Sequence, residues 1–355
     1  MHLQGVQTVM MMMKRTWLCV VVVGSLAACK GGGQKDAPPA SSAAPTASVA
    51  APTASAAASG GATAGPESAF DQQTRWIRAF AEAFNKHDAD ALARGYSIEG
   101  STKWGEYKSL FADDPDAKVT VTRSWHVREV ALFEFVRGGS SEAAGKKPYG
   151  YVGATLLWFD RAGQVTEEAT YFDELAMEVQ LGTAKPPASE VDVRPIRAVP
   201  PYSATWEQHR ASGSAEEAKL LGVREHLYAK LTASAEKDFL ALMTDDIELF
   251  AYDEPADAKG KKAIADVFKG WKVMFSDIKV EAEHSWACED YAIFEGTFAG
   301  THTGPWGPIK ATNREFKNHF VDVTRINKDG KVDRMWTYSN NAELISQILP
   351  EPGKK

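Results

Sequence analysis

Apolar residues recur in this chain first with a helical spacing and later with a strand spacing. Ile77, Phe80 and Phe84 lie three or four residues apart, which predicts an amphipathic helix with one apolar face. From residue 278 to residue 286, Ile, Val, Ala, His and Trp alternate with Lys, Glu and Ser, and this alternation predicts a strand with two different faces. Helices that precede strands predict the α+β class, with the helices packed on one face of an antiparallel sheet.

This order of helices and strands occurs twice, because the sequence contains an internal repeat. A Ser-Trp pair precedes an Ala-Leu-Phe-Glu or Ala-Ile-Phe-Glu segment at the same spacing in both halves, and a Thr-Tyr pair follows in both. The matching segments are 124–125 with 285–286, 131–134 with 292–295, and 170–171 with 337–338. Such agreement over several segments predicts a duplicated domain.

Prolines mark the boundary between the two copies. Pro-Pro pairs at 186–187 and 200–201 interrupt any regular pattern between the copies, as turns and linkers do. The predicted parts are a first domain over 67–184, a linker over 185–214, a second domain over 215–349 and a tail over 350–355.

The N-terminal segment follows a different pattern. A basic pair at 14–15 precedes a short apolar run over 17–26. The run is too short to span a bilayer, so it predicts a cleaved signal peptide over 1–28. Translation from either Met1 or Met13 is compatible with this prediction.

The apolar run ends in Leu-Ala-Ala-Cys at 26–29, which resembles the lipobox of bacterial lipoproteins. The resemblance implies that Cys29 carries a lipid, becomes the mature N-terminus and anchors the chain to a membrane. Lys30 stands where the resemblance implies an Asp for inner-membrane retention, so we expect an outer-membrane location facing the periplasm. Ala, Pro, Ser, Thr and Gly dominate the next segment, which predicts a disordered tether over 29–66.

Several short motifs stand close together in the second copy. Gly-Thr-His-Thr-Gly occupies 300–304, Ala-Thr-Asn-Arg-Glu-Phe occupies 311–316, and Asp-Gly-Lys-Val occupies 329–332. Together they resemble the SnoaL-like polyketide and ester cyclase branch of the nuclear-transport-factor-2-like superfamily, and the first copy is similar in its helical opening at 84–92. The resemblance implies two cone-shaped domains, each a strongly curved antiparallel sheet packed on N-terminal helices, with an apolar pocket at its mouth.

The resemblance also implies a catalytic carboxylate near the end of the last strand. This position holds Asp173 in the first copy and Asn340 in the second. Asn cannot exchange a proton, so only Asp173 is a candidate general acid and base, a role that suits a carboxylate whose pKa an apolar pocket raises. Because Asp173 also precedes the closing helix, a role as the N-cap of that helix is the alternative.

Other candidate site residues come from the second copy. His302 lies in the Gly-Thr-His-Thr-Gly motif and is a second candidate general base, assisted by His284 or Asp322. Trp336 and Tyr338 alternate along one predicted strand and share a face, which fits either an aromatic ligand pocket or a filled core. The candidate ligand-binding residues are Trp125, Tyr171, His284, Trp286, Trp306, Trp336, Tyr338 and Asn340.

Metal ligands and cofactor motifs are not indicated. His284, His302 and His319 lack the close spacing that marks a metal site in sequence, so we expect neither a metal nor a cofactor. The formal net charge of −7 argues against a nucleic-acid partner for the folded part.

Three functions remain open. The first is a membrane-anchored lipoprotein that binds a small apolar or amphipathic molecule. The second is a cyclase, isomerase or hydrolase that uses Asp173 or His302. The third is a lipoprotein without activity that binds other proteins. In each case the two domains can pair with each other within one chain, since domains of this superfamily often dimerise through their sheets.

Overall fold

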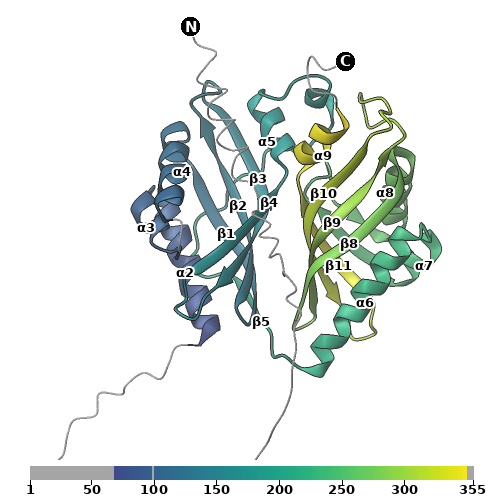
Figure 1. The fold of residues 1–355 in the computed structure, drawn as a ribbon, viewed down its shortest axis with the longest axis horizontal. Helices are drawn as coiled ribbons and strands as arrows, with labels where there is room; N and C mark the ends of the chain where they lie inside the picture. The colour runs from purple at the N-terminus through teal and green to yellow at the C-terminus, as the bar shows by residue number, and fades with distance from the viewer. Residues whose placement is uncertain (1–67, 98–99, 350–355) are drawn as a thin grey trace, which may run out of the picture. The chain divides into compact units, whose positions relative to one another are not determined.

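The computed structural model describes residues 68–97 and 100–349, which belong to one compact unit that begins at Pro66 (Figure 1). The predicted signal peptide, the Cys29 lipidation site, the tether up to residue 66 and the 350–355 tail lie outside the described residues. Among the helices in the described part, none combines the length and the apolar character needed to cross a bilayer.

The first half folds as helices packed on one antiparallel sheet. Ser68 caps the first helix, because its Oγ accepts a hydrogen bond from the Asp71 backbone N–H. The elements are α2 (Ala69–Asn85), α3 (Ala89–Ala93), α4 (Gly100–Asp113), β1 (Lys118–Val127), β2 (Val130–Ser141), β3 (Lys147–Phe159), β4 (Val165–Phe172) and α5 (Glu174–Leu181). Helices α2, α3 and α4 cover one face of this sheet (Figure 1).

The segment between the two halves adds a strand to the first sheet. It contains a short 3₁₀ helix, η1 (Ala188–Glu190), and β5 (Glu207–Arg210), which pairs in parallel with β1. The order in the first sheet is therefore β4-β3-β2-β1-β5. The proline pattern predicted an irregular linker here and gave no sign of β5.

The second half repeats this plan and extends it. Ser214 and Glu217 form a capping box at the start of its first helix. The elements are α6 (Ala215–Thr232), α7 (Glu236–Ala241), β6 (Met243–Ala251), β7 (Ala258–Lys259), α8 (Gly260–Met274), β8 (Phe275–Cys288), β9 (Tyr291–His302), β10 (Glu315–Ile326), β11 (Val332–Ser339) and α9 (Asn341–Ile348). The sheet order is β7-β6-β11-β10-β9-β8.

The strand registers match the repeat that the sequence shows. Glu134 of β2 pairs with Ala154 of β3, and Glu295 of β9 pairs with Val321 of β10 at the equivalent place. Strands β1 to β4 thus correspond to β8 to β11. The predicted α+β class with two curved sheets and covering helices is confirmed.

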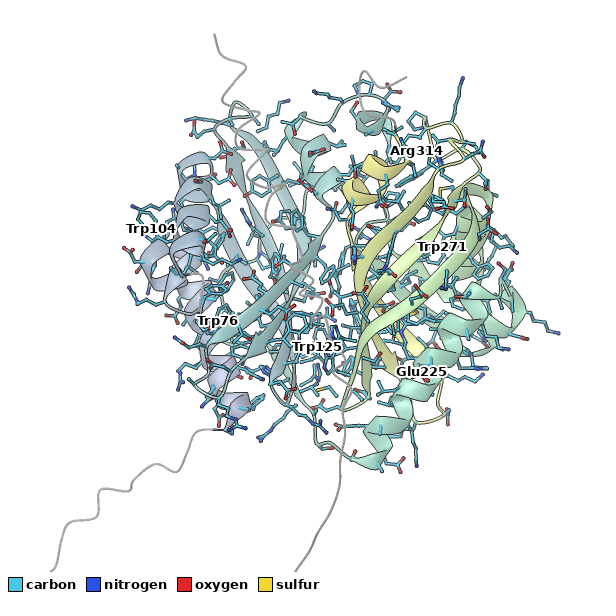
Figure 2. The ribbon with its side chains drawn as sticks, viewed as in Figure 1. Trp76, Trp104, Trp125, Glu225, Trp271 and Arg314 are labelled. Atoms are coloured by element: carbon cyan, nitrogen blue, oxygen red, sulfur yellow. The ribbon has the colours of Figure 1, made fainter. Side chains whose placement is uncertain are left out.

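Four apolar clusters hold the described part of the fold together, and three of them show how the two sheets are covered. One lies between the helices and the sheet of the first domain, and one lies in the same place in the second domain. The third joins the two sheets and contains Trp125 and Tyr171 of the first domain with Trp336 and Tyr338 of the second. Figure 2 shows Trp125 between the two sheets, where it contacts His209 and Tyr291. Apart from residues 281–285 of the edge strand β8, which are exposed, each sheet is therefore covered on both faces, by its own helices and by the other sheet.

Candidate functional site

Most of the predicted ligand-binding aromatics lie between the two sheets. Trp125, Tyr171, Trp336 and Tyr338 are buried in the cluster that joins the sheets, and Trp286 packs against it. The predicted common face of Trp336 and Tyr338 is thus the face that meets the first domain.

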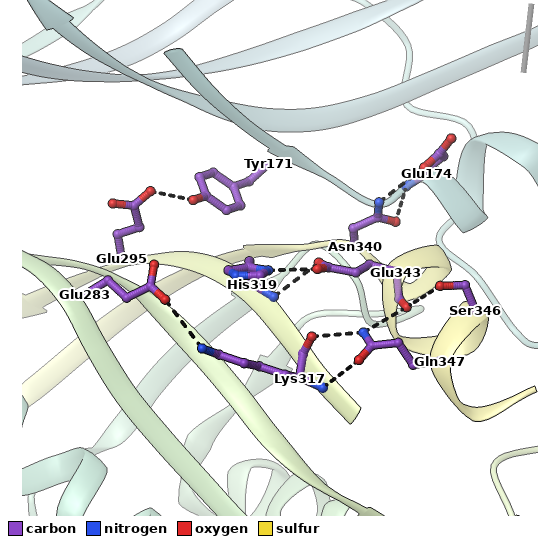
Figure 3. Close-up of polar contacts among 10 residues, drawn as sticks. All are labelled: Tyr171, Glu174, Glu283, Glu295, Lys317, His319, Asn340, Glu343, Ser346 and Gln347. Atoms are coloured by element: carbon purple, nitrogen blue, oxygen red, sulfur yellow. Dashed lines mark hydrogen bonds and ion pairs between the residues drawn. The ribbon is translucent and has the colours of Figure 1, made fainter. Parts of the chain in front are cut away.

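Tyr171 and Tyr338 make reciprocal hydrogen bonds across this interface. Tyr171 Oη donates to Glu295 Oε1 at 2.5 Å (Figure 3), and Tyr338 Oη donates to Glu134 Oε2 at 2.5 Å. The two tyrosines hold equivalent positions in the repeat, and so do the two glutamates. This exchange of identical contacts is what a two-fold symmetric dimer makes, here between two halves of one chain.

The carboxylates of this interface also have basic partners at equivalent positions. Arg123 Nε lies 2.9 Å from Glu134 Oε1, and His284 Nδ1 lies 2.7 Å from Glu295 Oε2. Arg123 and His284 each stand two residues before the repeated Trp. His284, a predicted ligand-binding residue, is thus part of the interface, at its half-exposed edge.

Asp173 and Asn340 also occupy equivalent places between the domains. Asp173 Oδ1 accepts from the Asn341 backbone N–H at 3.2 Å, and Asn340 Oδ1 accepts from the Glu174 backbone N–H at 3.2 Å (Figure 3). Each side chain therefore binds the first turn of the other domain's last helix. Burial, reinforced by the nearby charge of Asp253, holds the pKa of Asp173 well above its usual range.

His302 is buried at the end of β9. Its Nδ1 lies 3.1 Å from Thr312 Oγ1, while its Nε2 has no hydrogen-bond partner within residues 68–97 and 100–349. Burial lowers its pKa, because desolvation disfavours the charged imidazole. Neither His302 nor Asp173 is among the residues that line the cavity described next, so their catalytic roles stay predictions.

A cavity of about 130 Å³ lies inside the second domain, between its helices and its sheet. Its walls are mainly apolar and aromatic, with contributions from Phe239, Met243, Ile264, Phe268, Phe298 and Met335. Of the predicted ligand-binding residues, Trp306 lines this cavity.

A buried polar group forms part of the cavity wall. Arg224 and Tyr228 of α6 both reach Asp322 of β10: Arg224 Nη2 makes an ion pair with Asp322 Oδ2, and Tyr228 Oη donates to the same oxygen at 2.7 Å. Arg224 and Tyr228 are one helical turn apart, so both face the sheet. Burial raises the pKa of Asp322 and lowers that of Arg224 to about 10, because desolvation outweighs their mutual attraction.

A second polar group lines the cavity where β6 and β11 end. Ser339 Oγ donates to Asp253 Oδ2 at 2.5 Å, and Asn341 Nδ2 donates to the Asp253 carbonyl at 2.7 Å. Trp271 Nε1 donates to Glu254 Oε1 at 3.3 Å. Burial and the charge of Asp253 raise the pKa of Glu254 to about 7. A carboxyl group with such a pKa can bind or release a proton near neutral pH.

The first domain has different residues at the positions of the first polar group. The side-chain oxygens of Asn85 and Thr232 accept the backbone N–H groups of Val119 in β1 and Val280 in β8, which are equivalent strands, and this aligns α2 with α6. In this alignment Ile77 occupies the position of Arg224, and Ala81 occupies the position of Tyr228. The strand registers place Thr155 at the position equivalent to Asp322.

Aromatic side chains fill the interior of the first domain. Phe80 contacts both Trp76 and Phe133, and Phe84 packs on Phe111 with ring centroids 5.2 Å apart. The first domain also lacks the segment with Asp253 and Glu254. Three residues separate Tyr96 from α4, whereas 16 residues separate the equivalent Met243 from α8 and include most of β6 and all of β7.

Sequence reasoning named only Asp322 among these polar cavity residues, as a helper of His302. The hydrogen-bond partners of Asp322 include instead Arg224, Tyr228, Thr324 and Thr337. Two signals were available: Asp322 interrupts an apolar strand, Phe-Val-Asp-Val at 320–323, and Arg224 shares a helical face with Tyr228 and apolar Leu231. Within the described part of the chain, no three His, Cys, Asp or Glu side chains come together as a metal site.

Most of the residues that line the cavity lie in a segment that matches a known protein family. Residues 223–348 match the family model of the SnoaL-like polyketide cyclases, so the second domain is a SnoaL-like domain. No curated protein matches the chain.

Solved structures with similarity to this chain each cover roughly one domain of it. AclR from Streptomyces galilaeus is 21% identical, covering 39% of this chain and 87% of its own, with a TM-score of 0.35. TsrD from Streptomyces laurentii is 20% identical (38% and 98% covered, TM-score 0.34). An NTF2-like protein from Burkholderia xenovorans is 19% identical (38% and 98% covered, TM-score 0.31).

Proposed function

We propose that this protein is an exported, lipid-anchored binding protein whose second domain holds a small, mainly apolar molecule. The cavity of about 130 Å³ with apolar and aromatic walls carries this proposal. Ligand sites usually combine such walls with a few polar groups, and the Arg224–Asp322 pair and the Asp253–Glu254 segment supply these groups.

The first domain acts as the fixed partner of the second in this proposal. The reciprocal bonds of Tyr171 and Tyr338 with Glu295 and Glu134 support it, because they tie the two sheets together as in a symmetric dimer. The lipid on Cys29 and the tether would hold this pair near the outer membrane, facing the periplasm.

Membrane anchoring can be tested by feeding cells that express the chain with an alkyne fatty acid. We expect the label in the wild-type protein and its loss in Cys29→Ser, with both proteins measured in the membrane fraction. A Cys288→Ser control should keep the label, because Cys288 is buried in the fold. Equal labelling of wild type and Cys29→Ser would contradict the anchor.

Ligand binding can be tested by native mass spectrometry of the protein purified from its source membrane. We expect a bound small molecule on the wild type and its loss in Ala251→Leu, since Ala251 lines the cavity and the added methyl groups would occupy it. The matched control is Ala256→Leu, on an exposed residue nearby. Retention of the molecule by Ala251→Leu would contradict a site in this cavity.

A second candidate function, acid–base catalysis, is favoured by the pKa of about 7 at Glu254. A general acid or base works best with a pKa near the working pH. The test is exchange of the methyl protons of acetophenone in D₂O, followed by NMR. Catalysis predicts faster exchange with the wild type than without protein, and its loss in Glu254→Gln. Loss in Asp173→Asn or His302→Gln instead would assign the role to those residues, and equal exchange with and without protein would exclude this reaction.

A further inference from the structure

Arg224 has hydrogen-bond donors that the protein does not use. The residue is 2% exposed and lines the cavity. Its Nη2 binds Asp322, but Nε and Nη1 have no hydrogen-bond partner within the part of the chain that the structure describes. A guanidinium carries five N–H groups, and leaving buried donors unsatisfied is costly. An acceptor oxygen of a ligand in the cavity can satisfy one of them.

The other members of this polar group do not supply that acceptor. Tyr228 donates its own hydroxyl to Asp322, and Thr324 donates to the second oxygen of the same carboxylate. The guanidinium carbon of Arg224 lies over the Tyr228 ring, 3.6 Å from the ring centroid. This contact holds the plane of the guanidinium in one orientation. The donors are therefore oriented before a ligand arrives.

Charge decides which kind of oxygen fits. Asp322 already neutralises Arg224, and the remaining ionisable groups on the cavity wall are the carboxyl groups of Asp192, Asp253 and Glu254. A carboxylate ligand would add a negative charge to this set inside an apolar wall, which is costly. An uncharged carbonyl oxygen accepts the same hydrogen bonds without that cost.

We propose that one of the unpartnered N–H groups of Arg224, on Nε or Nη1, donates a hydrogen bond to the uncharged carbonyl oxygen of a one-ring ketone, ester or amide. This inference rests on the proposed binding function and names the class of ligand. The size follows from the cavity: a dry cavity of about 150 Å³ binds benzene, and this one measures about 130 Å³.

Three molecules of nearly the same shape test the inference by calorimetry on the full chain in lipid nanodiscs, with empty nanodiscs subtracted. They are acetophenone, α-methylstyrene and benzoate, which place a carbonyl, a methylene and a carboxylate at the same point. We expect acetophenone to bind about tenfold more tightly than α-methylstyrene, as one added hydrogen bond does, and benzoate to bind more weakly than both.

Each outcome decides one question. If none of the three binds, the proposed binding function fails. If α-methylstyrene binds as tightly as acetophenone, or benzoate binds best, the binding function stands and the role of Arg224 is wrong. Because this comparison uses the wild-type chain, it does not depend on the folding of any variant.

A variant locates the effect at Arg224. In Arg224→Met/Asp322→Asn both charges of the pair are removed together, so no charged group is left buried without a partner. We expect acetophenone to lose its advantage while α-methylstyrene binds as before. The control Arg334→Met, at a surface ion pair with Glu248, should keep the advantage. A tenfold preference that persists in the double variant would overturn the assignment.

Discussion

The two domains share one plan and differ in what lies between helices and sheet. In the first domain Phe80, Phe84 and Phe133 pack ring on ring in that space, and Ile77 is fully buried there. In the second domain Arg224 stands at the position of Ile77, and a cavity opens beside it. The comparison teaches that a repeat can keep its strand registers while the side chains between helices and sheet change from an aromatic core to a cavity wall with buried charges.

The largest difference should appear when the two equivalent helix positions are changed. Arg224→Met leaves Asp322 buried without its cation, so we expect a loss of about 3–5 kcal/mol in unfolding free energy. Ile77→Val removes one methyl group from the first core and should cost about 1 kcal/mol. Urea unfolding followed by circular dichroism measures both. Equal losses would mean that the Arg224–Asp322 pair has no special place in the second domain.

One part of the pH dependence of stability should come from Glu254, in the segment that the first domain lacks. The pKa of Glu254 is about 7 in the folded protein, above its unfolded value of about 4.3. The folded state therefore holds this proton more tightly, and the associated stability is present at low pH and is lost as pH rises from about 4.3 through 7.

Glu254→Gln should remove its own part of this dependence, roughly 3 kcal/mol of unfolding free energy between pH 4.5 and 7.5, while Asp173 and Asp322, whose pKa values are also raised, keep theirs. The measurement is the urea midpoint across that pH range. The control Glu225→Gln, at an exposed position of α6, should keep the wild-type slope. A Glu254→Gln protein with an unchanged slope would place the raised pKa elsewhere.

The reciprocal tyrosines should differ in their contribution to stability. After Tyr171→Phe, Glu295 keeps its ion pair with His284, whereas Glu134 keeps Arg123, Thr122 and Tyr252 after Tyr338→Phe. We expect the free energy of unfolding to fall by about 2 kcal/mol in Tyr171→Phe and by about 1 kcal/mol in Tyr338→Phe. Thermal unfolding of both variants gives the comparison, and a larger loss for Tyr338→Phe would reverse the ranking.

The smallest effect is expected at the helix ends. Asn340 accepts from the Ala342 N–H of its own helix and from the Glu174 N–H of the first domain. Asn340→Ala should lower the free energy of unfolding by about 1 kcal/mol, as the loss of a helix cap does. Ser68→Ala removes a cap within one domain and should lower it by less. Urea unfolding of the two variants is sufficient, and a larger effect of Ser68→Ala would contradict the added role of Asn340 between the domains.

Much of the fold could be predicted from period and repeat. The alternation from residue 278 to residue 286 falls within β8, and the repeated segments fall at equivalent places in the two sheets. Strand β5 could not be predicted, because Glu-Gln-His-Arg carries no apolar alternation. Its place depends on pairing with β1, which only the folded chain provides.

The site was harder to predict than the fold. Strand period correctly placed Trp336 and Tyr338 on one face, but both faces of each sheet are covered here. Period alone cannot tell the face that meets a cavity from the face that meets another sheet. Arg224 and Asp322 come from segments far apart in sequence, so their pairing follows from helix packing and not from any local motif.

Xenon binding tests the difference between the two domains most directly, because xenon enters dry apolar cavities. Crystals pressurised with xenon should show it in the second domain, next to Phe268 and Phe298, and not between α2 and the first sheet. Xenon between α2 and the first sheet, or at equal occupancy in both places, would contradict the account in which aromatic side chains fill this space in the first domain and a cavity occupies it in the second.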